Sequence, residues 1–420
     1  MKRETQIAPS LIVTRILLLI ALVAAGALTS RAQATPDAGS CNQPAPKALT
    51  LVDVPGRPFE PIPTSDGCWI FVSFMGSPTQ RPGIAVFRRS GGKIARTRIV
   101  GVDGNPTGAV LTHDGRLLIV ANGDGEEFFD ASLLISGQGK PLIGSISDGA
   151  GSATIYANVT SDDKFLFVSD ERTQTITVIN LERARSSSFS QDDVVGKIPV
   201  ANSPISIEFS VDGKYLFATS EVARRDYGWK LECQPEGPNA SSPGQDWPQG
   251  VIHVVDLAKS ETDPAHSVLG NVPAGCSTVR LVLSAKGEVA YVTARNSNTV
   301  MAFDTAKLVS DPAHAMTGWE RVGSAPVGVA VFDDGKKVVA TNSNRFAGKA
   351  DDKQFLSVID AAKLSSGAPA LLGTIPAGAF PRELRVTADG RTLLLTNFNS
   401  STLEIIDLER LPIEPASKKN

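Results

Sequence analysis

The stretch PTGAVLTHDGRLLIVAN at residues 106–122 combines a tight-turn signal with an apolar run, and it decides the fold. Asp114-Gly115 suits a hairpin turn, because both residue types tolerate positive φ and let two short strands reverse direction. A run of four apolar residues follows at 117–120 and ends at the polar Asn122. Near-continuous apolar runs of this length indicate a strand that is covered on both faces. The stretch therefore predicts two antiparallel strands within a buried sheet.

The same pattern recurs seven times in one register. The turn pairs are Asp66-Gly67, Asp114-Gly115, Asp162-Asp163, Asp212-Gly213, Lys286-Gly287, Asp334-Gly335 and Asp389-Gly390. Nine residues before the second turn residue, each copy has a proline or a threonine, which is compatible with the start of a strand. A third strand pattern follows and ends in an acid or amide, as at Asn180, Asp256, Asp304, Asp360 and Asp407. With a fourth strand, each unit reads as one propeller blade.

The two ends of the repeat region predict how the ring closes. The last copy has three strands, and residues 49–54 match the fourth-strand pattern ahead of the first copy. We therefore expect an all-β fold, a seven-bladed β-propeller over residues 49–410 with four antiparallel strands per blade. The N-terminal strand would complete the seventh blade and remove exposed sheet edges. Residues 35–48 form a lead-in and residues 411–420 a C-terminal tail.

Residues 1–34 have the pattern of a secretory signal peptide. Basic residues precede an apolar run at 16–28, and Ala32-Gln33-Ala34 is a small-x-small cleavage site. The apolar run is too short to span a bilayer, so we expect an exported protein, periplasmic or extracellular, without a membrane span. An uncleaved anchor and lipidation at Cys41 are the weaker alternatives.

Charge and motifs limit the classes of partner. Removing residues 1–34 takes away four of 41 basic and one of 44 acidic residues, which leaves a net charge of −6. Without a basic cluster, nucleic acid and anionic membranes are poor candidate partners. The sequence has no P-loop, nucleophile elbow or haem-attachment motif, and we expect no cofactor. We expect a monomer that binds a small molecule or a protein.

Four cysteines in an exported chain suggest two disulfides, for which three pairings are possible. The order of strands favours Cys41–Cys68 and Cys233–Cys276, because the two members of each pair fall on the same face of the ring. Metal binding is the weaker alternative, since neither a Cys-x-x-Cys nor a paired-His spacing is present. We therefore expect no metal site.

One face of the ring is the better candidate for function. Loops from second to third strands, and from each blade to the next, share this face, which we call the loop face. The tight turns occupy the opposite face, the turn face. The largest elaboration, residues 222–249 in blade four, carries the loop candidates Arg224, Arg225, Trp229 and Trp247. We interpret it either as a binding lid or as an insertion packed on its own blade.

Polar residues near the loop face would line a central funnel. The ligand-binding candidates are Glu60, Tyr156, Asp170, Glu221, Arg280, Arg295, Asn342, Arg382, Glu383 and Asn397. Arg280 and Arg382 would hold an anion, and Glu60, Glu221 and Glu383 would act as bases or anchors. The alternative is that these charges pair with one another around a solvated channel. We assign no catalytic residue.

Residues 290–300, AYVTARNSNTV, resemble the YVTN repeat, and Thr341-Asn342 and Thr396-Asn397 stand in the same register. This resemblance implies a seven-bladed propeller in an exported protein. The superfamily includes lactonase-type propellers similar to 6-phosphogluconolactonase, whose inner strand carries Pro-Arg-His and is accompanied by a Glu after a second strand. Here Pro381-Arg382 matches, but Glu383 replaces the histidine and Glu221 lies in another blade.

The sequence therefore predicts an exported propeller that binds a ligand or a protein on its loop face. The alternatives are a lactonase-type hydrolase and a cell-envelope scaffold without a ligand pocket. A shared fold does not decide among them, because function resides in the site.

Overall fold

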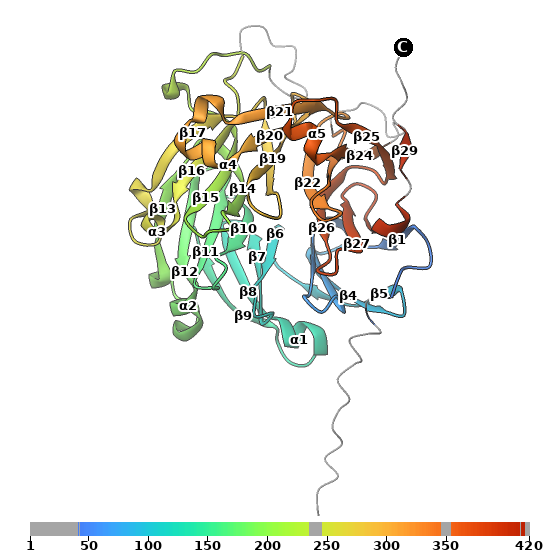
Figure 1. The fold of residues 1–420 in the computed structure, drawn as a ribbon. Helices are drawn as coiled ribbons and strands as arrows, with labels where there is room; N and C mark the ends of the chain where they lie inside the picture. The colour runs from blue at the N-terminus through green and yellow to red at the C-terminus, as the bar shows by residue number, and fades with distance from the viewer. Residues whose placement is uncertain (1–40, 42, 235–245, 346–353, 412, 416–420) are drawn as a thin grey trace, which may run out of the picture. The chain divides into compact units, whose positions relative to one another are not determined.

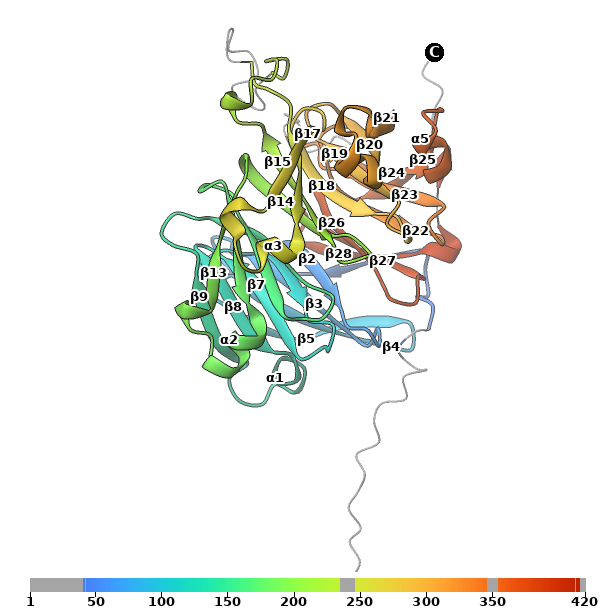
Figure 2. The same cartoon turned by 60° about the vertical axis from the view of Figure 1, so that its left-hand side comes forward.

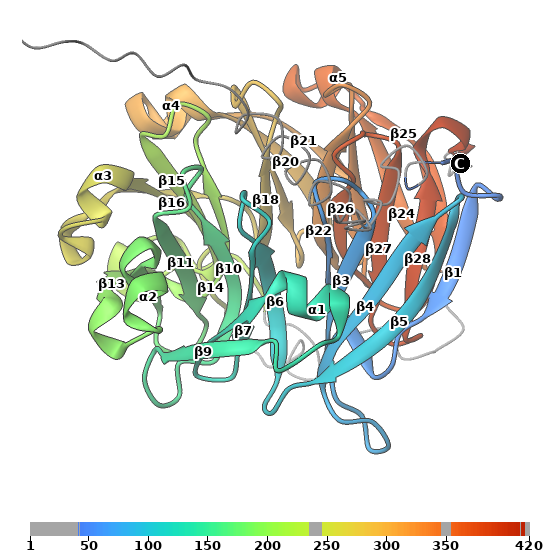
Figure 3. The same cartoon turned by 90° about the horizontal axis from the view of Figure 1, so that it is seen from below.

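The computed structural model describes Cys41 and residues 43–234, 246–345, 354–411 and 413–415. These residues form the predicted seven-bladed propeller of four-stranded antiparallel sheets, and the colours run once around the ring (Figure 1, Figure 3). The predicted signal peptide and most of the lead-in before residue 43 lie outside the described residues. Parts of the blade-four insertion and of the tail do so as well.

Each of the first four blades takes its strands in sequence order from the centre outwards. Blade one has β2 (Arg57–Pro63), β3 (Trp69–Met75), β4 (Gly83–Ser90) and β5 (Lys93–Gly101). Blade two has β6 (Pro106–Leu111), β7 (Leu117–Asn122), β8 (Gly125–Asp130) and β9 (Leu142–Ser147). Blade three has β10 (Thr154–Val159), β11 (Phe165–Asp170), β12 (Thr175–Asn180) and β13 (Val194–Pro199). Blade four has β14 (Asn202–Phe209), β15 (Tyr215–Val222), β16 (Val251–Asp256) and β17 (Val268–Pro273).

Blade five follows the same order, whereas blades six and seven carry additions from the ends of the chain. Blade five has β18 (Thr278–Leu283), β19 (Val289–Ala294), β20 (Thr299–Asp304) and β21 (Met316–Arg321). Blade six has β22 (Pro326–Phe332), β23 (Lys337–Asn342), β24 (Gln354–Asp360) and β25 (Leu371–Ala377), and the tail adds β29 (Glu414–Pro415) as a fifth strand. Blade seven has β26 (Pro381–Val386), β27 (Thr392–Asn397) and β28 (Thr402–Asp407), with β1 (Leu49–Asp53) outermost. β1 pairs antiparallel with β28 and lies beside it in Figure 3.

Short helices, which the sequence analysis did not predict, follow five of the third strands. They are α1 (Ala131–Ser136), α2 (Leu181–Ser187), α3 (Leu257–Ser260), α4 (Thr305–Ser310) and α5 (Ala361–Ser365). The acid or amide that ends each third strand caps the next helix, because its side chain accepts a hydrogen bond from a first-turn N–H group. The recurring Asp/Asn signal is therefore a helix-capping signal.

The core is divided among the seven interfaces between neighbouring blades, with one buried apolar cluster at each. The second strands show why their apolar runs are continuous. Leu118 packs against blade one, whereas its neighbour Ile119 packs against blade three. Successive side chains of a strand point to opposite faces, and both faces are covered here.

Hydroxyl groups join each blade to the next. Every inner strand has a β-bulge within its first five residues. In six blades a serine or threonine of the second strand donates to a carbonyl oxygen of the next inner strand: Ser73, Ser169, Thr219, Thr293, Thr341 and Thr396. Blade two has Ala121 at this position, and Thr107 there donates to the carbonyl of Thr154 instead.

Two disulfides join the predicted cysteine pairs, Cys41–Cys68 and Cys233–Cys276. The first ties the segment before β1 to the start of β3, and the second ties the blade-four insertion to the connection between blades four and five. Each closes a loop of the kind that typically adds about 2–4 kcal/mol of stability. Within the described part of the chain, no helix is long and apolar enough to cross a membrane.

Candidate ligand-binding site

The bulges of the inner strands determine what fills the centre of the ring. At a bulge two consecutive residues oppose one residue of the partner strand, so both side chains are directed to the centre. Among the first members of these pairs, Ile205, Val279 and Val327 form a buried apolar cluster, and the half-buried Ile155 packs against it. This cluster belongs to four different blades, and it forms an apolar layer near the loop face.

The second members of the pairs form a charged layer beneath it. Arg280 of blade five pairs with Glu383 of blade seven, with Nε 3.1 Å from Oε2 and a second contact from Nη2 to Oε1. The Arg280 guanidinium also lies over the Tyr156 ring of blade three, 4.7 Å from its centroid. These side chains are 2–4% exposed, so the contacts reach across the middle of the ring through protein rather than water.

A second pair completes this layer on the turn-face side. Arg385 of blade seven contacts the Glu60 carboxylate with Nη2, and the same nitrogen donates to the Tyr156 hydroxyl oxygen at 2.9 Å. Glu60 also accepts from the backbone N–H of Ala109 at 3.0 Å. Burial raises the pKa of Glu60, and the nearby Arg385 opposes that shift. The described residues therefore close the centre with a buried ion network.

Two blades carry glycine at the level of this layer, where the backbone of the next inner strand approaches closely. A Cβ atom on Gly108 would lie 2.6 Å from the carbonyl oxygen of Ile155, and one on Gly328 would lie 2.4 Å from that of Arg382. Both distances are too short for a real contact. The structure thus brings together four of the predicted candidates, Glu60, Tyr156, Arg280 and Glu383, and pairs them with one another or with Arg385. The interpretation as mutually paired charges describes them better than an open funnel does.

Arg382 lies above this network, on the loop-face side. Its guanidinium covers the Phe59 ring at 3.9 Å and lies 5.4 Å from the Phe398 centroid. Its buried Nε has no hydrogen-bond partner among the described residues, and its ion-pair distance to Glu383 is 4.0 Å. Burial lowers the pKa of Arg382 to about 10, since Glu383 offsets only part of that cost and three neighbouring arginines add to it.

Further charged side chains surround Arg382 on the loop face. Arg295 and Glu221 form a two-pronged salt bridge with both N–O distances at 2.8 Å, so these two candidates neutralise each other. Arg345 lies over Phe380 and Arg57 lies over Phe398, each 5.7 Å from the ring centroid. Glu171 is a further acidic residue near Arg382, and burial raises the pKa of Glu171.

Three candidates at the ends of second strands are bonded within their own blades. Asp170 accepts from Thr175 and Thr177 at 2.9 and 2.7 Å and from Lys197 at 3.3 Å. Asn342 donates to Ser357, and Asn397 donates to Glu404. These bonds hold second strands to third strands, so we now interpret the three residues as structural.

The described parts of the blade-four insertion contact their own blade and the start of blade five. Tyr227 and Trp229 cover a small buried cluster that contains Ala223 and Val251, and their rings meet edge to face at 5.5 Å. Arg224 forms a salt bridge with Asp226 inside the insertion, and the backbone of Trp247 forms an isolated antiparallel β-bridge with that of Cys233. Arg225 is exposed. In Figures 1 and 2 the segment after β15 rises above the strand ends on this side.

The sequence analysis missed Arg385, the phenylalanines around Arg382, and the serine and threonine hydroxyl groups that join each blade to the next. A signal was available for two of them. Arg385 stands five residues before the turn glycine, and Glu208 occupies the same register in blade four. The hydroxyl residues all stand six residues after the second turn residue. Phe398 gives no comparable signal, because its contact with Arg382 depends on the path of a loop.

Comparisons with known proteins identify the fold alone. No family model and no curated sequence matches the chain. It is similar in structure to hydrazine synthase of Kuenenia stuttgartiensis, with TM-score 0.59, 18% identity and coverage of 86% of this chain and 97% of that chain. A chain of the mitotic checkpoint complex matches with TM-score 0.61, 12% identity and coverage of 86% and 93%. The β-propeller domain of Myceliophteria thermophila Cps50 (Swd1) matches with TM-score 0.58, 11% identity and coverage of 86% of this chain and 99% of that chain. The YVTN-repeat resemblance stays a prediction.

Proposed function

We propose that this protein is an exported binding protein that holds a small anionic molecule on its loop face, against Arg382. The observation that supports this most is the guanidinium of Arg382. It is largely buried, its charge is poorly matched by Glu383 at 4.0 Å, and its Nε has no partner among the described residues. A buried charge is costly unless it is paired, and a bound carboxylate, phosphate or sulfate group would supply the pair.

The neighbours of Arg382 support a molecule with an apolar or aromatic part as well. Phe59, Phe380 and Phe398 surround the guanidinium within 5.7 Å of its carbon atom. Such a site combines a few convergent polar groups with apolar walls, which is typical of small-molecule sites. The two disulfides support an oxidising compartment and therefore export.

The two alternative functions, a lactonase-type hydrolase and a scaffold without a ligand pocket, predict different results. A lactone hydrolase needs a carboxylate that is free to act as a base, but both oxygens of Glu383 contact Arg280. Turnover of an aldonolactone above background, lost in Arg382→Ala, would favour that hydrolase. A scaffold without a ligand pocket would show neither turnover nor binding.

A thermal-shift screen of small carboxylates, phosphate esters and sulfate esters tests the proposal. A ligand at 100 times its dissociation constant adds about 2.7 kcal/mol to the stability of the protein. We expect Arg382→Met to weaken binding of the best ligand at least tenfold in calorimetry. Arg391→Met is the matched control, because Arg391 is a half-exposed arginine on the turn face that pairs with Glu409 at 3.0 Å. The proposal fails if no anion binds, or if Arg382→Met binds as tightly as the unchanged protein.

A further inference from the structure

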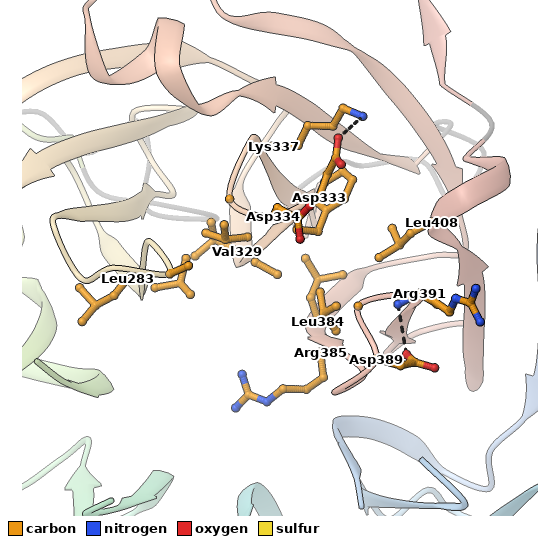
Figure 4. A pocket seen from close by; sticks show the side chains of 18 of the residues that line it. Leu283, Val329, Asp333, Asp334, Lys337, Leu384, Arg385, Asp389, Arg391 and Leu408 are labelled. Carbon is orange, nitrogen blue, oxygen red and sulfur yellow. Dashed lines mark hydrogen bonds and ion pairs between the residues drawn. The ribbon is translucent and has the colours of Figure 1, made fainter. Parts of the chain in front are cut away.

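A separate cavity opens among the tight turns on the turn face. It has a volume of about 440 Å³ and is lined by residues of blades one to four, together with Arg385 of blade seven. A neighbouring cavity of about 740 Å³ lies among the turns of blades five to seven, and Arg385 borders it too. Figure 4 shows the Arg385 side chain extending away from Asp389 and from the blade-six turn. The buried ion network separates both cavities from Arg382.

Glu208 gives the 440 Å³ cavity an acidic group without a partner. Its carboxylate makes no hydrogen bond or salt bridge with any described residue, and the residue is half-buried. Burial raises its pKa to about 7, while Arg385 opposes that shift. A half-buried carboxylate that lines a cavity and has no cation of the described residues within salt-bridge distance is available to an ammonium group.

Arg385 supplies the opposite charge in the same cavity. Its Nη2 is engaged by Glu60 and Tyr156, whereas its Nε and Nη1 have no hydrogen-bond partner among the described residues. These two nitrogens are not enclosed by protein, and the side chain is 34% exposed. The guanidinium is therefore fixed in position, and its Nε and Nη1, which lie on different edges, each remain able to donate a single charge-assisted hydrogen bond to a carboxylate. Arg385 and Glu208 do not form a salt bridge with each other.

The rest of the cavity wall combines apolar and polar side chains. Ile62, Val110 and Leu111 line it, and Asn158 adds an amide whose nitrogen is already bonded to the carbonyl of Ile207. A ligand of one charge would leave either Glu208 or the free side of Arg385 unmatched. A zwitterion with an apolar side chain would satisfy both groups and cover the apolar part of the wall.

We propose that this cavity binds a free α-amino acid, with the ammonium group at Glu208, the carboxylate at Arg385 and the side chain against Ile62 and Val110. This site does not depend on the loop-face proposal, since it uses other residues on the opposite face. The groups around Glu208 are Arg385, Glu60, Arg280 and Tyr156, with His113 at the rim held by Asp163 at 2.8 Å. Protonated Glu208 would not hold an ammonium ion, so affinity falls as the pH drops through about 7.

Calorimetry with the twenty common amino acids tests the proposal. The best ligand is then compared with the matching amine, which lacks the carboxylate, and the matching acid, which lacks the amine. We expect both to bind at least tenfold more weakly, and Glu208→Gln to weaken the amino acid at least tenfold. Asp212→Asn removes an exposed carboxylate from another turn, and Arg382→Met alters the loop face; both should leave the affinity unchanged.

Three results would overturn the assignment. They are no binding by any amino acid, unchanged affinity in Glu208→Gln, and an amine that binds as tightly as its amino acid. Because the comparison of ligands uses the unchanged protein, it decides the role of Arg385 even if variants of Arg385 do not fold. Loss of anion binding in Arg382→Met with retained amino-acid binding would separate the two sites.

Discussion

The hydroxyl of Thr396 in the last blade donates a hydrogen bond of 2.7 Å to the carbonyl oxygen of Phe59 in the first blade. The hydroxyl oxygen of Thr396 also accepts a hydrogen bond from the backbone N–H of Glu383 at 3.2 Å. One buried side chain therefore satisfies the N–H group that a bulge frees and joins the two ends of the ring.

We expect Thr396→Val to lower the free energy of unfolding by about 1–3 kcal/mol. Valine keeps the shape but leaves a buried donor and a buried acceptor unpaired. Urea denaturation measures the change, and Thr79→Val on an exposed loop is the matched control. Equal losses in the two variants would show that the interblade bond has no special role.

We expect removal of β1 to destabilise the whole ring, because its loss exposes the edge of β28. A chain that starts at residue 58 also loses the Cys41–Cys68 disulfide. The proper reference is therefore the longer chain with Cys41→Ser and Cys68→Ser. The shorter chain should melt at a lower temperature than this reference; coincident melting curves would contradict a closing role for β1.

The Arg280–Glu383 pair should show strong coupling in a double-mutant cycle. Arg280→Met and Glu383→Gln each leave one buried charge without its partner, and each should cost about 3–5 kcal/mol. The double variant should cost clearly less than the sum, because it leaves neither charge. The exposed pair Arg391–Glu409 is the control and should couple by less than about 1 kcal/mol. Additive losses at Arg280 and Glu383 would refute the pairing.

Glu126 should make stability depend on pH. Its carboxyl group is buried and shares a hydrogen bond with the carboxyl group of Asp148, and Asp170 and Lys197 lie nearby. Burial raises its pKa from the usual 4.5 to about 7. The stability due to the neutral form is complete below pH 4.5 and is lost as the pH rises to about 7, because the unfolded chain gives up this proton first.

Glu126→Gln does not titrate and should avoid that loss. We expect its stability relative to the unchanged protein to be greater at pH 8 than at pH 4, by on the order of 3 kcal/mol. Thermal denaturation across this range measures the difference. Glu288→Gln, at an exposed position, should follow the unchanged protein at every pH. If Glu126→Gln does the same, the carboxyl group at this position is not perturbed by its burial.

Local pattern was sufficient for the blades, because each of them is defined by a turn and by apolar runs close in sequence. It was also sufficient for both disulfides. For Asp170, Asn342 and Asn397 it predicted ligand binding, whereas the described hydrogen bonds of these side chains lie inside their own blades. The pairing of Arg280 with Glu383 joins residues 103 positions apart, and it depends on two bulges that direct both side chains to the centre. No local signal specifies which charged residues meet there.

The last blade also sets an order of events in folding. Its outermost strand comes from the start of the propeller and its three inner strands come from the end, so the paired residues Leu49 and Ile406 are 357 positions apart. Chains acquire structure from the N-terminus during synthesis, and contacts of long sequence separation form slowly. β1 therefore stays unpaired until nearly the whole chain has been synthesised. Until then the nascent protein exposes an unpaired strand edge, which a chaperone would need to cover.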